Sequence, residues 1–311
     1  MDIVNRLTKT FDLQIIYSLL NAHDGSTEAT NQILNSKKRL PLVRHYKEHP
    51  CIPTLEERMA LLNSDAQIYI NQRSFDYFAT TYNVPERSAY IMDADLLSES
   101  FMTGLSTHKL RESDGRPHLL VAGGLSISED RLDMRDFCAE MSKRDVHVHL
   151  YGRMLGRTRG GSLIEGDAKT SRVYGEMAES NSYIHLHKYI PPSQFSSMWS
   201  QYDAGVMHAR VNSNHEEAEF ETMNLPYRYS AYLAAGLPLI VPSFGQEAMS
   251  ELATEHGIGI VFDSYDDLRE RVEDRANMKQ VTERAKKKRT EFSFEKVAPM
   301  LVDVLRRYAK K

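Results

Sequence analysis

The sequence has few of the features that mark a secreted or membrane-spanning protein. Its 311 residues include only two cysteines, Cys51 and Cys138, which lie far apart and lack the spacing of a zinc site. Unpaired thiols of this kind favour a reducing compartment. No apolar stretch is long enough to span a bilayer, and the first residues lack the apolar core of a signal peptide. We therefore expect a cytoplasmic protein.

An excess of charge of either sign is missing as well. The 39 lysines and arginines are nearly balanced by 43 aspartates and glutamates, which gives a formal net charge of −4. A chain with this balance has no overall attraction to nucleic acid or to an anionic membrane, and we predict no nucleic-acid partner. The dense basic run KKKR, at 286–289, is interpreted as the solvated face of a helix, with a peripheral membrane contact as the alternative.

What the sequence does contain is a regular alternation of apolar, strand-like runs with helix-like stretches. Four such runs occupy the first part of the chain, at 13–20, 40–46, 66–71 and 88–93. Six follow in the second part, at 118–124, 146–152, 183–189, 203–209, 237–243 and 257–263. Helices of the second part are predicted near 130–144, 191–201, 226–235, 246–256 and 265–290. This succession predicts an α/β fold whose parallel sheets are covered on both faces.

The two parts are unequal, which indicates one complete and one partial domain. The second part has the six strands of a Rossmann-like domain, whereas the first has four and begins at a strand that should lie well inside such a domain. We predict a partial first domain at 1–105, a linker at 106–117, a second domain at 118–290 and a terminal amphipathic helix within 291–311. Because exposed sheet edges bind other strands, we expect a partner chain or an oligomer to complete the partial domain.

The stretch 224–243 predicts a short helix that leads directly into a buried strand. Asn224 can cap the helix and Pro226 suits its first turn, while Gly236 is expected to end it. A helix N-terminus can hold a phosphate, and Arg228 adds a cation with a planar fork of donors. The alternative is an αβ unit with a purely structural role.

Two other strand ends carry residues that suit a ligand. The run at 118–124 ends in Gly123-Gly124, where the lack of side chains lets backbone N–H groups approach a diphosphate closely. After the first predicted strand come His23 and Asp24, a pair suited to acid–base chemistry. For this pair, a polar turn that caps the next helix is the alternative.

Four histidines alternate along two of the predicted strands. They are His147 and His149 on one strand, and His185 and His187 on the next. Each pair points to one side of its strand, so the four can share a sheet face. No acidic or cysteine ligand accompanies them at a fixed spacing, and we predict histidines packed under helices rather than a metal site.

The run NLPYRYSAYLAAGLPLIV, at 224–241, resembles the nucleotide-sugar-binding element of glycosyltransferases of the GT-B architecture, in the group-4 style. The resemblance implies two Rossmann-like domains, the first of them shortened in this chain, and a C-terminal helix at 291–311 that crosses back to the first domain. It also implies transfer of a sugar from a nucleotide-diphosphate sugar to an acceptor hydroxyl, without a metal and without a cofactor. The acceptor, whether glycan, lipid or protein, is not implied.

The resemblance further implies which residues touch the donor and the sugar. Arg228 takes the place of a lysine that faces the diphosphate, and Tyr189 with Ile190 matches the backbone beside the nucleobase. His23, with Asp24 beside it, matches a strand end that faces the sugar and would be catalytic. The implied donor-binding residues are Gly123, Gly124, Arg131, Tyr151, Gly152, Tyr189, Ile190, Asn224, Leu225 and Arg228.

Two positions depart from the pattern of this family. Members carry a glutamate where this chain has Ala231, and many carry another where it has Met223. Both carboxylates are common donor contacts. Their absence keeps open a second hypothesis, in which the chain is a catalytically inactive binding or scaffold subunit that pairs with another chain.

Overall fold

The computed structural model describes residues 15–20, 26–35, 40–47, 54–84, 88–127, 132–157, 163–207 and 218–309. These residues form two compact units. The first contains the described residues up to Asp95, those from 218 to Leu225 and those from Phe294 onward. The second contains Leu96 to 207 and Pro226–Ser293. The predicted linker at 106–117 therefore lies within the second unit, where it includes the short helix α5 (Arg111–Asp114).

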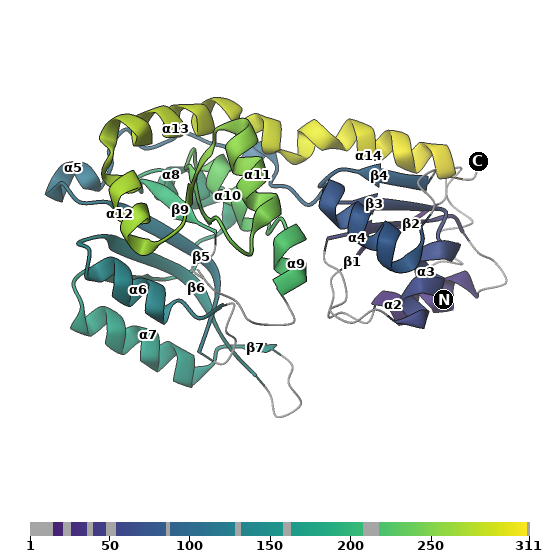
Figure 1. Ribbon diagram of the computed structural model, residues 1–311, viewed down its shortest axis with the longest axis horizontal. Helices are drawn as coiled ribbons and strands as arrows, with labels where there is room; N and C mark the ends of the chain where they lie inside the picture. Colours follow the sequence, from purple (N-terminus) through teal and green to yellow (C-terminus); the bar gives the residue numbers. More distant parts are fainter. Residues whose placement is uncertain are drawn as a thin grey trace. The chain divides into compact units, whose positions relative to one another are not determined.

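The sheet of the first unit contains four parallel strands in chain order (Figure 1). They are β1 (Ile16–Leu20), β2 (Leu42–Tyr46), β3 (Ala66–Tyr69) and β4 (Ala89–Ile91). Each lies within one of the four predicted apolar runs. Among the described residues β1 pairs only with β2, so it is the end strand of this sheet.

Helices cover both faces of this first sheet. On one face Tyr46 and Tyr69 pack with side chains of α3 (Leu55–Asn63) and α4 (Gln72–Tyr82), and α2 (Ser26–Leu34) lies beside α3. On the other face Val43 and Ile68 pack against α14 (Phe294–Tyr308). The terminal helix buries Leu301 and Val304 there, which confirms its predicted amphipathic character.

A short helix from the middle of the chain also belongs to the first unit. This is α9 (Ala218–Met223), whose last carbonyl accepts a hydrogen bond of 2.6 Å from the side chain of Asn71. Asn71 is at the same time the N-cap of α4, because its Oδ1 accepts from the Ser74 amide. One asparagine thus ties the start of α4 to the end of α9.

The sheet of the second unit has the strand order of a Rossmann fold. Its parallel strands run in the order β8 (Ile184–His187), β6 (His147–Arg157), β5 (His118–Ser126), β9 (Ala204–Val206), β10 (Leu239–Pro242) and β11 (Gly259–Phe262). Each lies largely within a predicted run. The order reverses between β5 and β9, which is the topological switch point where open α/β sheets bind their ligands.

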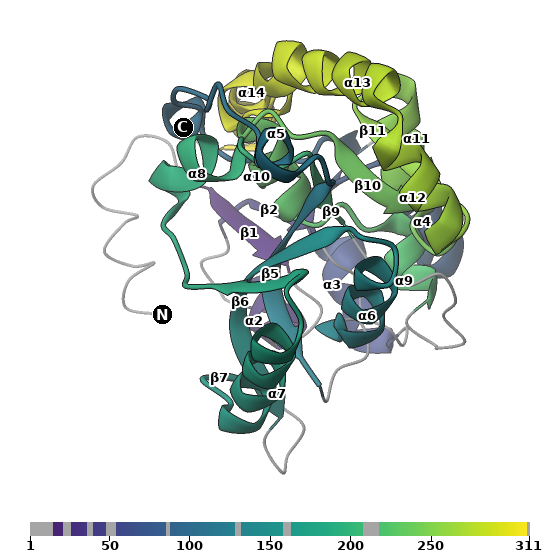
Figure 2. The ribbon, with the colours of Figure 1, turned by 90° about the vertical axis from the view of Figure 1, so that its left-hand side faces the viewer.

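The two faces of this second sheet are packed differently. On one face, side chains such as Val148 and Ile260 form the main core with α6 (Arg135–Ser142), α7 (Ala168–Ser180), α12 (Tyr265–Glu273) and α13 (Arg275–Lys288). Figure 2 shows α6 and α7 beside β6. The other face meets α8 (Phe195–Trp199) and α10 (Arg228–Ala234), while α11 (Glu247–His256) connects β10 to β11.

Two features of this unit differ from the predicted elements. An antiparallel strand, β7 (Leu163–Glu165), pairs with the end of β6 and is followed by α7, and neither was predicted. The single helix predicted at 265–290 is broken at Asp274, whose side chain accepts from the Asn277 amide at 3.0 Å and starts α13. None of the described helices is both long and apolar enough to cross a bilayer.

Candidate functional site

The switch point of the second unit is held together by the buried side chain of Tyr232, on α10. Its hydroxyl accepts a hydrogen bond of 2.7 Å from the Ala122 amide on β5 and donates one of 3.1 Å to the Val206 carbonyl on β9. Its ring leaves no room for a side chain on Gly205, because a Cβ there would lie 2.3 Å from the ring. Tyr232 therefore fixes α10 against the two strands between which the order reverses.

The boundaries of α10 agree only in part with the sequence prediction. Gly236 ends the helix as predicted: its φ is +67°, and its amide donates to the Leu233 carbonyl while that of Leu237 donates to Tyr232. The predicted cap at the other end is wrong. The helix begins at Arg228 after Tyr227, with no side-chain cap, so Asn224 lies too early in the chain to serve one.

A cavity of about 640 Å³ opens at this switch point, toward the carboxyl ends of the strands. Residues of β5, β6, β7, α8, α10 and the segment after β8 surround it. They are Ala122, Gly123, Tyr151, Arg153, Glu165, Tyr189, Ile190, Pro192, Phe195, Trp199, Tyr227, Arg228 and Ala231. The volume suits a ligand of the size of a nucleotide.

Arg228 brings a positive charge to the wall of this cavity. Its guanidinium donates to the Met207 carbonyl at 3.2 Å, immediately after β9. It also lies over Gly123, where a Cβ would approach Nη2 to 3.3 Å. Gly123 has a φ of +125°, which side chains rarely tolerate. Gly123 lies within β5, paired with Gly152, so the prediction that the strand ends at Gly123-Gly124 is wrong: the strand continues to Ser126. The glycine permits both this local backbone conformation and the position of the arginine.

Aromatic rings form much of the remaining wall. Phe195 and Trp199 stack with their ring centroids 3.8 Å apart, and Tyr151 meets Trp199 edge to face. Burial raises the pKa of Tyr151, so its phenol stays neutral. Tyr189 is 66% exposed, and an exposed aromatic ring is the type of surface on which a nucleobase stacks.

The wall also contains an ion pair that the sequence analysis missed. Arg153, on β6, is bonded to the carboxylate of Glu165 on β7. Arg153 directly follows the predicted Tyr151-Gly152 strand end, so its position along the strand was an available signal. The sequence around Glu165 gave no such signal, because this residue reaches the cavity only through the antiparallel pairing of β7 with β6.

Five of the predicted donor-binding residues line the cavity together: Gly123, Tyr151, Tyr189, Ile190 and Arg228. Gly124 and Gly152 do not line it. They sit within paired strands, where a Cβ would come within 2.5 Å and 2.4 Å of leucine side chains, so close packing accounts for them.

The other predicted site residues lie elsewhere. Asn224 and Leu225 belong to the first unit, and neither lines the cavity. His23, Asp24 and Arg131 lie outside the residues that the structure describes. Ala231 lines the cavity at the place where the family carries a glutamate, and Met223 is buried in the first unit.

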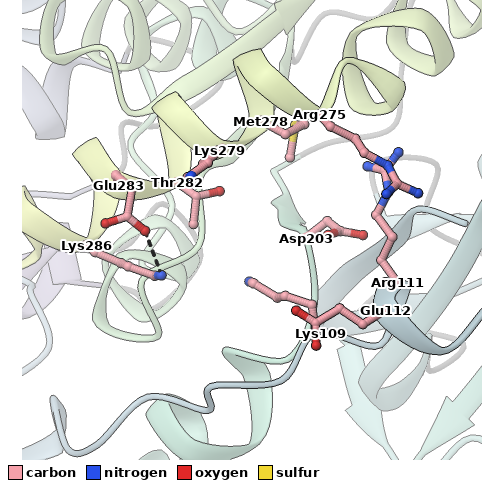
Figure 3. Close-up of a pocket in the computed structure, with 10 residues that line it drawn as sticks. All are labelled: Lys109, Arg111, Glu112, Asp203, Arg275, Met278, Lys279, Thr282, Glu283 and Lys286. Carbon is pink, nitrogen blue, oxygen red and sulfur yellow. Dashed lines mark hydrogen bonds and ion pairs between the residues drawn. The ribbon is translucent and has the colours of Figure 1, made fainter. Parts of the chain in front are cut away.

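A second, smaller cavity of about 260 Å³ lies at the opposite, amino-terminal edge of the same sheet (Figure 3). Figure 3 shows the guanidinium groups of Arg111 and Arg275 close together on one side of it, with Lys109 and Asp203 near its floor. Asp203 accepts a hydrogen bond of 2.8 Å from the His118 amide, as expected for a residue at the start of a strand. Burial lowers the pKa of Lys109 to about 8. This edge of a parallel sheet is not where ligands usually bind.

The second unit matches a known family over much of its length. Residues 161–294 match the family model described as "Glucosyltransferase 3-like, C-terminal domain". The chain is also similar to Glucosyltransferase 3 of Streptococcus gordonii, with 41% identity over 58 residues. That segment covers 19% of this chain and 17% of the relative, so the match spans a small part of the relative's length.

The whole fold is similar to those of solved structures. Sucrose-phosphate synthase from Thermosynechococcus elongatus gives a TM-score of 0.68 at 12% identity, over 98% of this chain and 76% of the synthase. HepE from Anabaena, in complex with UDP and glucose, gives 0.66 at 12% identity, over 98% of this chain and 82% of HepE. The chain therefore has the GT-B glycosyltransferase fold that its 224–241 motif indicated, and its residues 161–294 are similar to the carboxyl-terminal domain of Glucosyltransferase 3-like proteins.

Proposed function

We propose that the chain is a glycosyltransferase that binds a nucleotide-diphosphate sugar in the switch-point cavity of its second unit. The observation that carries this proposal is the position of Arg228. Its guanidinium lies over Gly123 where the strand order reverses, at the edge where such sheets bind phosphates. An arginine fork there supplies both a charge and directed donors for a diphosphate.

The rest of the cavity supports the same orientation of the donor. With the diphosphate against the cavity side of Arg228 and beside Gly123, the nucleobase would lie toward Tyr189 and Ile190. The exposed ring of Tyr189 offers a stacking surface for any base. Since HepE shares the fold and its structure holds UDP and glucose, UDP-glucose is the first donor to test.

In the proposed reaction the oxygen of an acceptor hydroxyl bonds to the anomeric carbon of the donor sugar. The bond between that carbon and the diphosphate oxygen breaks, the nucleoside diphosphate leaves with the electron pair, and the hydroxyl proton is released. Arg228 would stabilise the charge that develops on the leaving diphosphate. His23 and Asp24 remain the proposed catalytic pair on the resemblance alone.

We also propose that this transfer needs no metal ion. Of the described residues that line the cavity, Glu165 is the one with a carboxylate, and it is bonded to Arg153. A magnesium ion on a nucleotide usually takes one or two protein carboxylates as ligands. In this cavity Arg228 supplies the positive charge in its place.

A second candidate function rests on a specific observation about α10. Ala231 is buried in the wall of the cavity, so no carboxylate from this helix reaches the donor. The chain would then bind a nucleotide sugar, or only its partner chain, without transferring the sugar. This is the inactive scaffold subunit of the sequence analysis.

Nucleotide binding and donor turnover together separate the two functions. Trp199 is the one tryptophan of the sequence and lines the cavity, so its fluorescence reports binding directly. We expect UDP to change this fluorescence, and UDP-glucose to release UDP slowly in the presence of a metal chelator. Binding without any release of UDP from UDP-glucose or other UDP-sugars would favour the scaffold. If UDP, GDP and ADP all fail to bind at millimolar concentration, the enzyme proposal fails.

Tyr189 gives a sharper test of the orientation of the donor. Tyr189→Ala should weaken UDP binding by about 1–3 kcal/mol, which is the scale for stacking one base on an aromatic ring. Tyr189→Phe keeps the ring and should bind as the unchanged chain does. Equal losses in both variants would move the base away from Tyr189.

A further inference from the structure

Five histidines share one face of the sheet in the second unit, on the side away from its main core. They are His118 on β5, His147 and His149 on β6, and His185 and His187 on β8. We call this set the histidine array. Its rings stack between neighbouring strands, with centroids 4.4 Å apart for His118 and His147 and 4.3 Å for His149 and His185.

Hydrogen bonds connect the rings of the array in one consistent direction. Nδ1 of His118 lies 2.8 Å from Nε2 of His149, whose own Nδ1 lies 2.9 Å from Nε2 of His187. In parallel, Nδ1 of His147 lies 2.9 Å from Nε2 of His185. Every bond joins the Nδ1 of one ring to the Nε2 of the next. The Nε2 atoms of His118 and His147 are thus left at the start of the array.

These two atoms meet a carboxylate from α5. Oδ2 of Asp114 lies 3.1 Å from Nε2 of His118 and 3.1 Å from Nε2 of His147. The three ligand atoms lie within 4.8 Å of one another. Both histidines are buried, whereas the Asp114 side chain is 36% exposed and leaves a path from solvent. Residue spacing gave no sign of this group, because Asp114 and His118 lie far along the chain from His147 and its neighbours.

Two imidazole nitrogens and one carboxylate oxygen form a ligand set that zinc prefers. The array also supplies hydrogen-bond acceptors for the ring nitrogens of these histidines that do not face the metal. If Nε2 of His118 and of His147 binds a metal, each Nδ1–H can donate to the Nε2 of His149 or His185 behind it.

We propose that Asp114, His118 and His147 bind a zinc ion at the amino-terminal edge of the sheet, with water completing its coordination. The ion would attach α5 to the starts of β5 and β6. All three ligands belong to the second unit, on the edge of the sheet opposite Gly123 and Arg228. The site stands apart from the proposed donor cavity and from the proposed metal-independent transfer, and the role we assign to the ion is to hold α5 against the sheet.

Cobalt binding gives a direct test with an optical signal. The full chain, without a histidine tag and freed of metal by a chelator, is titrated with Co²⁺ and then with Zn²⁺. We expect the visible absorption of four-coordinate cobalt to saturate at one ion per chain and to disappear as zinc displaces it. Absence of this absorption together with absence of zinc binding by calorimetry would overturn the proposal.

Single substitutions test which residues bind the zinc ion. Asp114→Ala should weaken zinc binding by at least about tenfold, whereas Glu112→Ala, an exposed carboxylate on the same helix, should leave it unchanged. His185→Ala removes the ring behind His147 and should cost roughly 10- to 100-fold in affinity. Equal zinc affinity in Asp114→Ala and Glu112→Ala would refute the assigned ligands.

Thermal unfolding followed by Trp199 fluorescence provides a readout of the proposed structural role. Zinc should raise the unfolding temperature of the second unit in the unchanged chain and in Glu112→Ala, but not in Asp114→Ala. Arg228→Ala should bind zinc normally, so failure of the donor site and failure of the zinc site can be told apart.

Discussion

Gly123 and Arg228 occupy one small space at the switch point of the second sheet. The glycine has a φ of +125°, and a Cβ on it would lie 3.3 Å from the nearest guanidinium nitrogen of the arginine. The two residues are more than a hundred positions apart in the sequence. A larger residue at position 123 would crowd the guanidinium of Arg228, so the arginine in this position requires the glycine.

A side chain at position 123 should therefore displace Arg228 and strain the backbone. We predict that Gly123→Ala destabilises the second unit by about 1–3 kcal/mol and weakens UDP binding. Trp199 fluorescence measures both effects, in urea unfolding and in nucleotide titration. The matched control is Gly175→Ala on α7, where a Cβ meets nothing within 4 Å. An unaltered UDP affinity in Gly123→Ala would mean that the diphosphate does not lie beside Gly123.

Removing the Arg228 guanidinium should weaken the binding of the diphosphate group and leave the binding of the nucleoside unchanged. We predict that Arg228→Ala weakens UDP binding by about 1.5–3 kcal/mol, roughly ten- to 150-fold, because a charged hydrogen-bonding partner is lost. Uridine, which lacks the diphosphate, should bind both forms equally and serves as the control ligand. Titrating the unchanged chain and Arg228→Ala with UDP and with uridine measures this difference in affinity. If Arg228→Ala left the UDP affinity unchanged, the arginine would have no place in the site.

The first unit should lose stability in acid through His45. Burial, and to a smaller extent the charge of Lys47, lowers the pKa of this histidine to about 3. The unfolded chain therefore takes up the proton first, so the contribution of the neutral ring is complete above pH 6.5 and is lost as the pH falls from there toward 3.

Between pH 6.5 and pH 5 this loss amounts to about 2 kcal/mol. We predict that His45→Gln is correspondingly less acid-sensitive than the unchanged chain. Hydrogen exchange of the β2 and β3 amides at each pH measures the difference for the first unit. Identical pH profiles for the two proteins would show that His45 does not titrate as its burial requires.

The terminal helix should contribute directly to the core of the first unit. Leu301 is buried against the sheet, whereas the adjacent Val302 is 39% exposed. We predict that Leu301→Ala destabilises this unit by about 2–5 kcal/mol and that Val302→Ala changes its stability by less than about 0.5 kcal/mol. Hydrogen exchange of the backbone amides in β2 and β3 measures the stability change in both variants. Equal, small effects would contradict the packing of α14 on this sheet.

Much of the candidate site could be predicted because local chemistry determines it. Gly236 ends α10 with a positive φ, as glycine after a helix usually does, and the apolar run behind it forms β10. The start of the same helix could not be placed correctly. Asn224 has the side chain of a cap, but its segment packs in the first unit, and this tertiary association outweighs its local preference.

Residues that depend on non-local pairing were missed for the same reason. Glu165 reaches the cavity only because β7 pairs antiparallel with the end of β6, and nothing in its neighbourhood in the sequence indicates a ligand. Asp114 on α5 contacts His147 on β6, and the whole of β5 lies between the two residues in the sequence. No rule of residue spacing predicts a pair of this kind.

Local sequence patterns were enough to predict the α/β class, the parallel strands of both sheets, the amphipathic terminal helix and the motif at 224–241, because periodicity, glycine positions and apolar runs act over a few neighbouring residues. The strand order, and with it which strand ends meet, follows from the packing of the complete sheets. That order places Arg228 over Gly123 at one edge of the sheet and Asp114 beside two histidines at the other. Burial of the sheet faces selects this arrangement, and no local segment contains that information.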